Sequence, residues 1–220
     1  KTIIKMKENL FEAQYDVTKK SKLRKFYETH KILIFSSVIA IVTILITISF
    51  YLNIKEKKVI LLSDNYIEAK IFLQNGDREK AKNILKQVIL SDNKTYSTLS
   101  LFLILNENLI DDQKELSSLF DHLLENNKFR KEIKDLIIFK RALFKSSFIS
   151  ELELLEILKP LITKETLWKP NALLLIGDHF FSKGEYLKAK DFYIQTLSLK
   201  NLHKEFYEYA RSQLMLISNE

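Results

Sequence analysis

The chain has 220 residues, of which 46% are hydrophobic and 29% are charged, a balance typical of a folded protein rather than a disordered one. It contains no cysteine, which excludes a disulfide framework and a lipid-modified cysteine among these residues. A formal net charge of +7 would favour nucleic-acid binding if it belonged to the folded part, but its distribution argues against this.

The positive charge is concentrated near the N-terminus. Residues 1–31 contain nine Lys or Arg and four Asp or Glu, a net charge of +5, whereas residues 55–220 contain 26 and 24, a net charge of +2. We therefore expect this tail to meet anionic lipid headgroups rather than nucleic acid. Apolar residues among the charges of residues 7–30 predict an amphipathic helix at the membrane surface or continuing into a span, and a frayed cytoplasmic tail is the alternative.

The next segment, residues 32–54, is a run of 23 residues without a charge. As a helix it would be about 35 Å long, enough to cross a hydrocarbon core of about 30 Å. A buried helix of a soluble core rarely runs this long without a charge, and a cleaved signal peptide has an apolar region of only about 7–15 residues. Because residues 1–31 precede the run and no small-x-small cleavage site follows it, we predict a retained single-span anchor.

The flanking charges predict the orientation of this anchor. Lysines and arginines gather between Lys19 and Lys31, and basic residues are retained on the cytoplasmic side of a membrane, although Lys55, Lys57 and Lys58 lie on the other flank. We expect a single-pass membrane protein with a cytoplasmic N-terminus and with the large domain, residues 55–220, on the other side of the membrane. Protease protection that placed residues 60–220 in the cytoplasm would contradict this.

Within the span, small residues recur on one helix face, at spacings of four, three and four: Ser36, Ala40, Thr43 and Thr47. Such a face allows close packing against another helix in lipid. The alternative is that the hydroxyl groups bind carbonyl groups of their own helix.

Beyond residue 57 the sequence has helical periodicity and no strand pattern. The helices are expected at residues 59–75, 78–91, 95–107, 112–126, 129–146, 150–163, 168–183, 186–199 and 203–218. Asp77, Asp112 and Ser150 are predicted N-caps, Pro170 suits a first helical turn, and Pro160 should end or kink its helix.

The three glycines of the chain indicate how these helices pair. Gly76 and Gly184 suit positive-φ turns between two helices, and Gly177 suits a close approach of two helices. Residues 170–203 fill the tetratricopeptide pattern, in which Gly177 is expected to face Ala189 at the helix crossing. The pattern is formed by Leu173, Ile176, Gly177, Phe180, Gly184, Tyr186, Ala189 and Tyr193.

Residues 62–95 fill the same pattern more weakly, through Ala69, Phe72, Gly76, Ala81, Leu85 and Val88. Gly76 and Gly184 are 108 residues apart, which leaves room for two further repeats between them. The predicted fold is therefore all-α: one transmembrane helix, then a tetratricopeptide-like α-solenoid of about four helix pairs, and a last helix that caps it.

This layout resembles the YfgM-like family of bacterial inner-membrane proteins. The likeness rests on the basic tail LFEAQYDVTKKSKLRKFYETHK, the single span, the helix pairs, and the segment LWKPNALLLIGDHFFSKGEYLKAKDFYIQTL. The middle repeats depart from the pattern, because their small-residue positions are hard to find. The resemblance implies an ancillary subunit of the Sec translocon that assists newly exported, unfolded polypeptides together with a membrane-anchored periplasmic peptidyl-prolyl isomerase.

We find no residues that form an active site, a cofactor site or a metal site, and we predict a protein that is not an enzyme. The four histidines have no metal-ligand spacing, and three glycines cannot form a phosphate-binding loop. His179, beside Asp178, is interpreted as a solvated or partner-facing polar residue.

Binding is the mode of action that remains. Stacked helix pairs present a concave surface lined by the first helix of each pair, which suits an extended peptide or a partner helix. The expected partner-binding residues are Tyr66, Lys70, Leu73, Asn171, Leu174, Asp178 and Phe181. The alternative to the translocon role is an envelope scaffold for cell-wall or division machinery, which could use the same anchor and solenoid.

Overall fold

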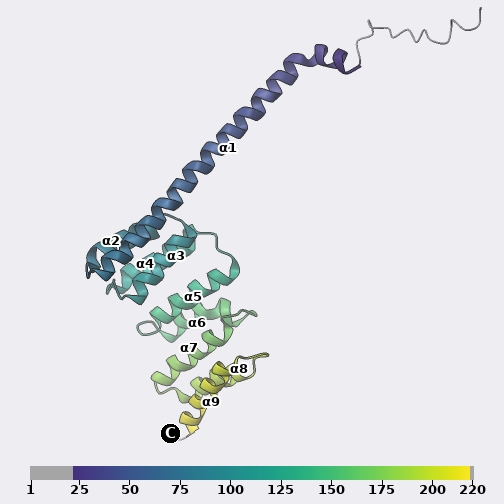
Figure 1. Cartoon of the computed structure of the whole chain (residues 1–220). Helices are drawn as coiled ribbons and strands as arrows, with labels where there is room; N and C mark the ends of the chain where they lie inside the picture. The colour runs from purple at the N-terminus through teal and green to yellow at the C-terminus, as the bar shows by residue number, and fades with distance from the viewer. Residues whose placement is uncertain (1–21, 219–220) are drawn as a thin grey trace, which may run out of the picture. The chain divides into compact units, whose positions relative to one another are not determined.

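The structure, a computed structural model, describes residues 22–218. This part of the chain contains nine α-helices and no strand, which confirms the all-α class (Figure 1). The helices are α1 (Lys22–Gln74), α2 (Arg78–Ile89), α3 (Lys94–Asn106), α4 (Gln113–Asn126), α5 (Lys131–Lys145), α6 (Glu151–Ile162), α7 (Lys169–Ser182), α8 (Tyr186–Leu197) and α9 (Lys204–Ser218).

Helix α1 unites two segments that the sequence analysis treated separately. It continues without a break from the apolar run into the helix expected at residues 59–75. The physical reason is that residues 22–74 contain neither glycine nor proline, and the charged residues 55–58 are good helix formers. Residues 1–21 of the predicted amphipathic tail lie outside the described residues.

Among the described residues, one helix is long and apolar enough to cross a membrane, and it lies within α1 at Phe26–Gln74. None of its most apolar stretch is buried, which argues against a core helix of a soluble domain. The prediction of an N-terminal helix able to span a membrane is therefore confirmed.

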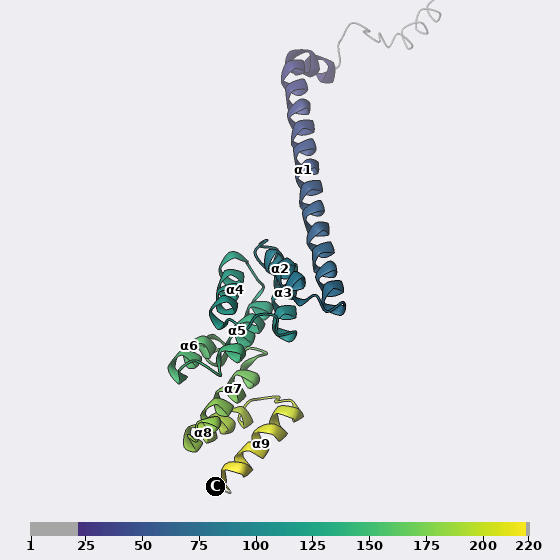
Figure 2. The same ribbon diagram turned by 90° about the vertical axis from the view of Figure 1, so that its left-hand side faces the viewer.

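The chain divides into two compact units between Lys58 and Val59, close to the predicted boundary at residue 55. The second unit contains the end of α1 and all later helices. From α2 to α9 each helix packs against the next one along the chain, and α7 also contacts α5 and α9. Figures 1 and 2 show this succession in chain order.

The second unit has two apolar cores that meet at α5. The first is formed by α1 to α5 and includes Ala69, Ala81, Leu85, Leu101, Phe120 and Ile137. The second is formed by α5 to α9 and includes Ala142, Leu158, Ile176, Phe180, Ala189 and Tyr193. Because Ile137 and Ala142 lie on the same helix, α5 links the two cores.

The predicted helix caps are confirmed. The side chains of Asp77, Asp112 and Ser150 accept hydrogen bonds from first-turn amides, at 3.2 Å from Lys80, 2.8 Å from Lys114 and 3.2 Å from Glu153. Asn93 caps α3 in the same way, and it was not among the predicted caps. Pro170 lies in the first turn of α7, and α6 ends at Ile162, two residues after Pro160.

Three of the turns between paired helices share one hydrogen-bond pattern. Gly76 and Gly184 have φ values of +82° and +73°, and Asn108 takes the equivalent position with φ +46°. In each turn the backbone N–H of the next residue donates a hydrogen bond to the carbonyl oxygen five positions earlier in the chain. These bonds run from Asp77 to Phe72, from Leu109 to Ile104 and from Glu185 to Phe180, at 2.9 to 3.0 Å. Asparagine tolerates the left-handed region, so Asn108 can form the same turn in the middle of the chain, where there is no glycine.

Gly177 allows a close contact, and the side chain nearest to it is that of Tyr193. A Cβ atom built on Gly177 would lie 2.6 Å from Cε1 of Tyr193, and the nearest atoms all belong to that ring rather than to Ala189. The small residue is needed because α8 places a fully buried tyrosine, and not only an alanine, against α7.

Candidate functional site

The second unit has a line of three cavities along helices α3, α5, α7 and α9. Their volumes are about 320, 300 and 340 Å³. Phe102 lines both the first and the second cavity, and Leu143 lines both the second and the third. We call this row of adjoining cavities the groove, and its three parts the first, second and third cavity.

The third cavity lies among α5, α7 and α9. Its walls are mainly apolar, and its polar groups are two carboxylates, a phenol and an amide. The lining residues are Phe139, Leu143, Asn171, Leu174, Leu175, Asp178, Glu205, Phe206 and Tyr209. No lysine or arginine lines it, so its charged groups are the two carboxylates alone.

Asp178 is the centre of a side-chain network in this cavity. Its carboxylate accepts a hydrogen bond of 2.7 Å from the hydroxyl of Tyr193 and one of 3.1 Å from the hydroxyl of Tyr209. The three residues come from α7, α8 and α9, so the network ties the last three helices together. A carboxylate suits this position because it can accept both bonds without donating one.

Burial determines how these groups ionise. Burial raises the pKa of Asp178 above its ordinary value, and the two tyrosine hydrogen bonds only partly oppose this. Burial and the neighbouring Asp178 carboxylate raise the pKa of Tyr209 to about 12, and the pKa of Tyr193 is raised for the same reasons. Both phenols therefore stay protonated at neutral pH and act as donors.

Three of the predicted partner-binding residues meet in the third cavity. Asn171, Leu174 and Asp178 lie together on the side of α7 that faces α5 and α9. Phe181, predicted with them, is half-buried, and its ring packs on Tyr186 with 5.4 Å between the ring centroids.

The candidates predicted on the first repeat lie elsewhere. Tyr66 and Leu73 are half-buried against the first core, and Lys70 is exposed. None of the three lines the groove. Their role in partner binding stays a prediction.

The sequence analysis missed the contribution of α5 and α9 to this cavity. Phe139 and Leu143 are four residues apart on α5, and Phe206 and Tyr209 are three residues apart on α9. This spacing signals a shared helix face, but α9 was expected only to cap the solenoid.

The hydroxyl groups of the span bind their own helix. Ser36 donates to the Leu33 carbonyl at 3.0 Å, Thr43 to Ile39 at 2.9 Å and Thr47 to Thr43 at 2.8 Å. This is the alternative stated for these residues. A role of this face and of Ala40 in helix packing stays a prediction.

His179 is buried, contrary to the expectation of a solvated or partner-facing residue. Its Nδ1 atom lies 3.0 Å from the carbonyl oxygen of Ser146 at the end of α5, so this hydrogen bond links α7 to α5. Burial lowers the pKa of His179, and Lys183 adds to this effect. Among residues 22–218 no group of three or more His, Cys, Asp or Glu side chains could hold a metal ion.

In comparisons with known proteins, no family model, no curated protein and no solved structure matches this chain. The functional assignment therefore rests on the geometry of the groove and on the apolar segment of α1.

Proposed function

We propose that this chain is a membrane-anchored protein–protein interaction module that binds an extended polypeptide in its groove. The observation that supports this best is that the three cavities adjoin: the first and second share Phe102, and the second and third share Leu143. An extended chain can place successive apolar side chains in successive cavities. Leu143, at the junction of two cavities, is 44% exposed, so apolar surface is left for a partner to cover.

The architecture that we propose is a tetratricopeptide-like α-solenoid. Successive packing from α2 to α9 supports this, as do the shared turn geometry at Gly76, Asn108 and Gly184 and the Gly177–Tyr193 contact. The turn between α5 and α6 differs, since none of the described residues there has a positive φ.

The partner that we propose follows from the resemblance to YfgM-like proteins. The chain would act beside the Sec translocon and a membrane-anchored periplasmic peptidyl-prolyl isomerase, and its groove would hold unfolded, newly exported polypeptides. The apolar segment of α1 supports this, because an anchored domain stays near the membrane where such polypeptides emerge.

A photo-crosslinking amino acid at Leu143 or Leu174 of the full-length protein in cells tests the proposal. We expect adducts with exported polypeptides and translocon subunits from these positions. Leu187 is the matched control, because it is 82% exposed on α8 and does not line the groove. Equal crosslinking from Leu187 and the groove would contradict the assignment, and adducts with wall-synthesis proteins alone would favour the scaffold instead.

A further inference from the structure

The first cavity has apolar walls that are only partly covered. It lies between α3 and the start of α5, and its apolar lining residues are Leu99, Phe102, Phe129 and Ile133. Leu99 is 42% exposed and Ile133 is 38% exposed, although both belong to a concave surface. Such surface gains free energy when an apolar group covers it.

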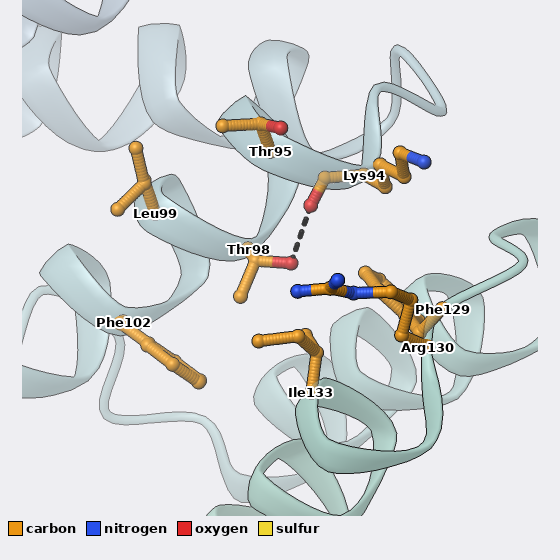
Figure 3. A pocket seen from close by; sticks show the side chains of 8 residues that line it. All are labelled: Lys94, Thr95, Thr98, Leu99, Phe102, Phe129, Arg130 and Ile133. Carbon is orange, nitrogen blue, oxygen red and sulfur yellow. Dashed lines mark hydrogen bonds between the residues drawn. The ribbon is translucent and has the colours of Figure 1, made fainter.

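The charged residues of this cavity are all cationic. Arg130 and Lys94 line it, and no aspartate or glutamate does. Figure 3 shows the Arg130 guanidinium extending across the cavity towards Thr98 of α3, whereas the Lys94 amine lies at the rim and turns outward.

Neither cation is neutralised by a side chain in the described part of the protein. Neither forms an ion pair or a hydrogen bond through its side chain. Two cations farther along the same helix are paired instead: Arg141 lies 2.5 Å from Asp121 and Lys145 lies 3.1 Å from Glu153. The positive end of the α5 dipole adds to this potential, because Arg130 at the N-cap supplies no side-chain acceptor to the first-turn amides.

We infer that the first cavity binds a bulky apolar side chain of a polypeptide that has an aspartate or glutamate next to it. This inference rests on the proposed function, because the polypeptide continues past Phe102 into the rest of the groove. The apolar side chain covers Leu99 and Ile133, and the neighbouring carboxylate pairs with Arg130. A planar guanidinium suits a carboxylate because it can donate two parallel hydrogen bonds.

The volume of the cavity favours one side chain over a long lipid chain. At about 320 Å³ it is at the small end of ligand pockets, which occupy about 300–1,000 Å³. The third cavity is lined by Asp178 and Glu205 and by no cation, so the two ends of the groove differ in charge. A polypeptide with its acidic residue at one end would therefore bind in one direction.

The test uses the full chain in nanodiscs of neutral phosphatidylcholine and three short fluorescent peptides. The peptides share one apolar pattern and differ only in the residue beside a central leucine, which is Asp, Asn or Lys. Fluorescence anisotropy should show the Asp peptide binding about tenfold more tightly than the Asn peptide at low salt, with the difference shrinking as salt rises. The Arg130→Gln variant should bind the Asp and Asn peptides alike, and Arg130→Glu should prefer the Lys peptide.

Lys134→Gln is the matched control, because Lys134 is exposed one turn along α5 and does not line the cavity. It should keep the preference for Asp. Equal affinity of the unmodified protein for the three peptides would overturn this inference and leave peptide binding by the groove intact. Failure of all three to bind would overturn the proposed function as well. Binding of palmitate that Arg130→Gln abolishes, without any preference among the peptides, would overturn the polypeptide occupant.

Discussion

The two ends of the groove use charge in opposite ways. At the third cavity, the Asp178 carboxylate is held by two tyrosine hydroxyls that come from α8 and α9. At the first cavity, the Arg130 guanidinium extends over apolar side chains and pairs with no side chain in the described residues. The Asp178 carboxylate therefore stabilises helix packing, and the Arg130 guanidinium can bind a partner.

Because of this difference, substitutions at one end of the groove should change the stability of the fold, and substitutions at the other end should change partner binding. Substitutions around Asp178 should weaken the packing of α7, α8 and α9, because its hydrogen bonds join them. Substitutions at Arg130 should alter binding and leave the free energy of unfolding within about 0.5 kcal/mol, as expected for an exposed surface residue.

The largest effect is expected from Gly177→Ala. Its new methyl group would meet the Tyr193 ring at 2.6 Å, and the fully buried ring has little room to move. Overpacking of this kind costs about 1–3 kcal/mol. Urea unfolding of the full chain in micelles, followed by circular dichroism, measures this loss.

Gly184→Ala is the control for the Gly177 substitution. No atom lies within 4 Å of a Cβ built on Gly184, but its φ of +73° disfavours alanine by roughly 1–2 kcal/mol. It should destabilise the turn and leave the Tyr193 hydroxyl bonded to Asp178. An unfolding free energy for Gly177→Ala equal to that of the unmodified chain would show that the α7–α8 crossing is looser than described.

A smaller effect is expected from Asp178→Asn. The amide has no negative charge, so ionising the nearby Tyr209 costs less, and the pKa of Tyr209 should fall from about 12 towards 10. Burial is the larger cause of the raised value and persists, so the pKa should remain above 10. Carbon-13 NMR of the tyrosine ring carbons measures it.

The variant Tyr207→Phe removes the signal of the other exposed tyrosine of α9, so that the Tyr209 signal can be told apart from it. Tyr207 itself forms no hydrogen bond with Asp178. A Tyr209 pKa that Asp178→Asn leaves unchanged would contradict the hydrogen bond between them.

Much of the helix layout could be predicted from sequence, because apolar periodicity and turn chemistry act locally. Each expected boundary from Arg78 onward lies within two residues of the observed one. The unbroken α1 was missed because charged residues 55–58 were treated as a boundary, although charge alone does not end a helix. Asn108 was missed because an asparagine is a weaker signal than glycine for a positive φ.

The candidate site could be predicted only in part, because it depends on how helices cross. The periodicity of α7 placed Asn171, Leu174 and Asp178 on one face, and they share the third cavity. The pairing of Asp178 with Tyr209 joins residues 31 positions apart, on helices that are not consecutive. Helical periodicity indicates which face of a helix is apolar, but not which distant hydroxyl meets it.

The smallest expected effect concerns His179, which is next to Asp178 on α7 but does not line the groove. Its pKa is lowered from 6.5 in the folded protein because burial disfavours the charged ring. Between that lowered pKa and 6.5 the unfolded chain therefore binds more protons than the folded chain. The free energy of unfolding should fall as the pH decreases through this window.

The variant His179→Asn should flatten this pH dependence, because an amide can still donate to the Ser146 carbonyl but does not titrate. Urea midpoints of the full chain in micelles, measured from pH 7.5 down to about 5, compare the two slopes. His203→Asn is the control substitution, because it replaces an exposed histidine of the same domain. If His179→Asn kept the slope of the unmodified chain, the acid sensitivity would arise from other groups, and the buried His179 contact between α5 and α7 would not contribute to it.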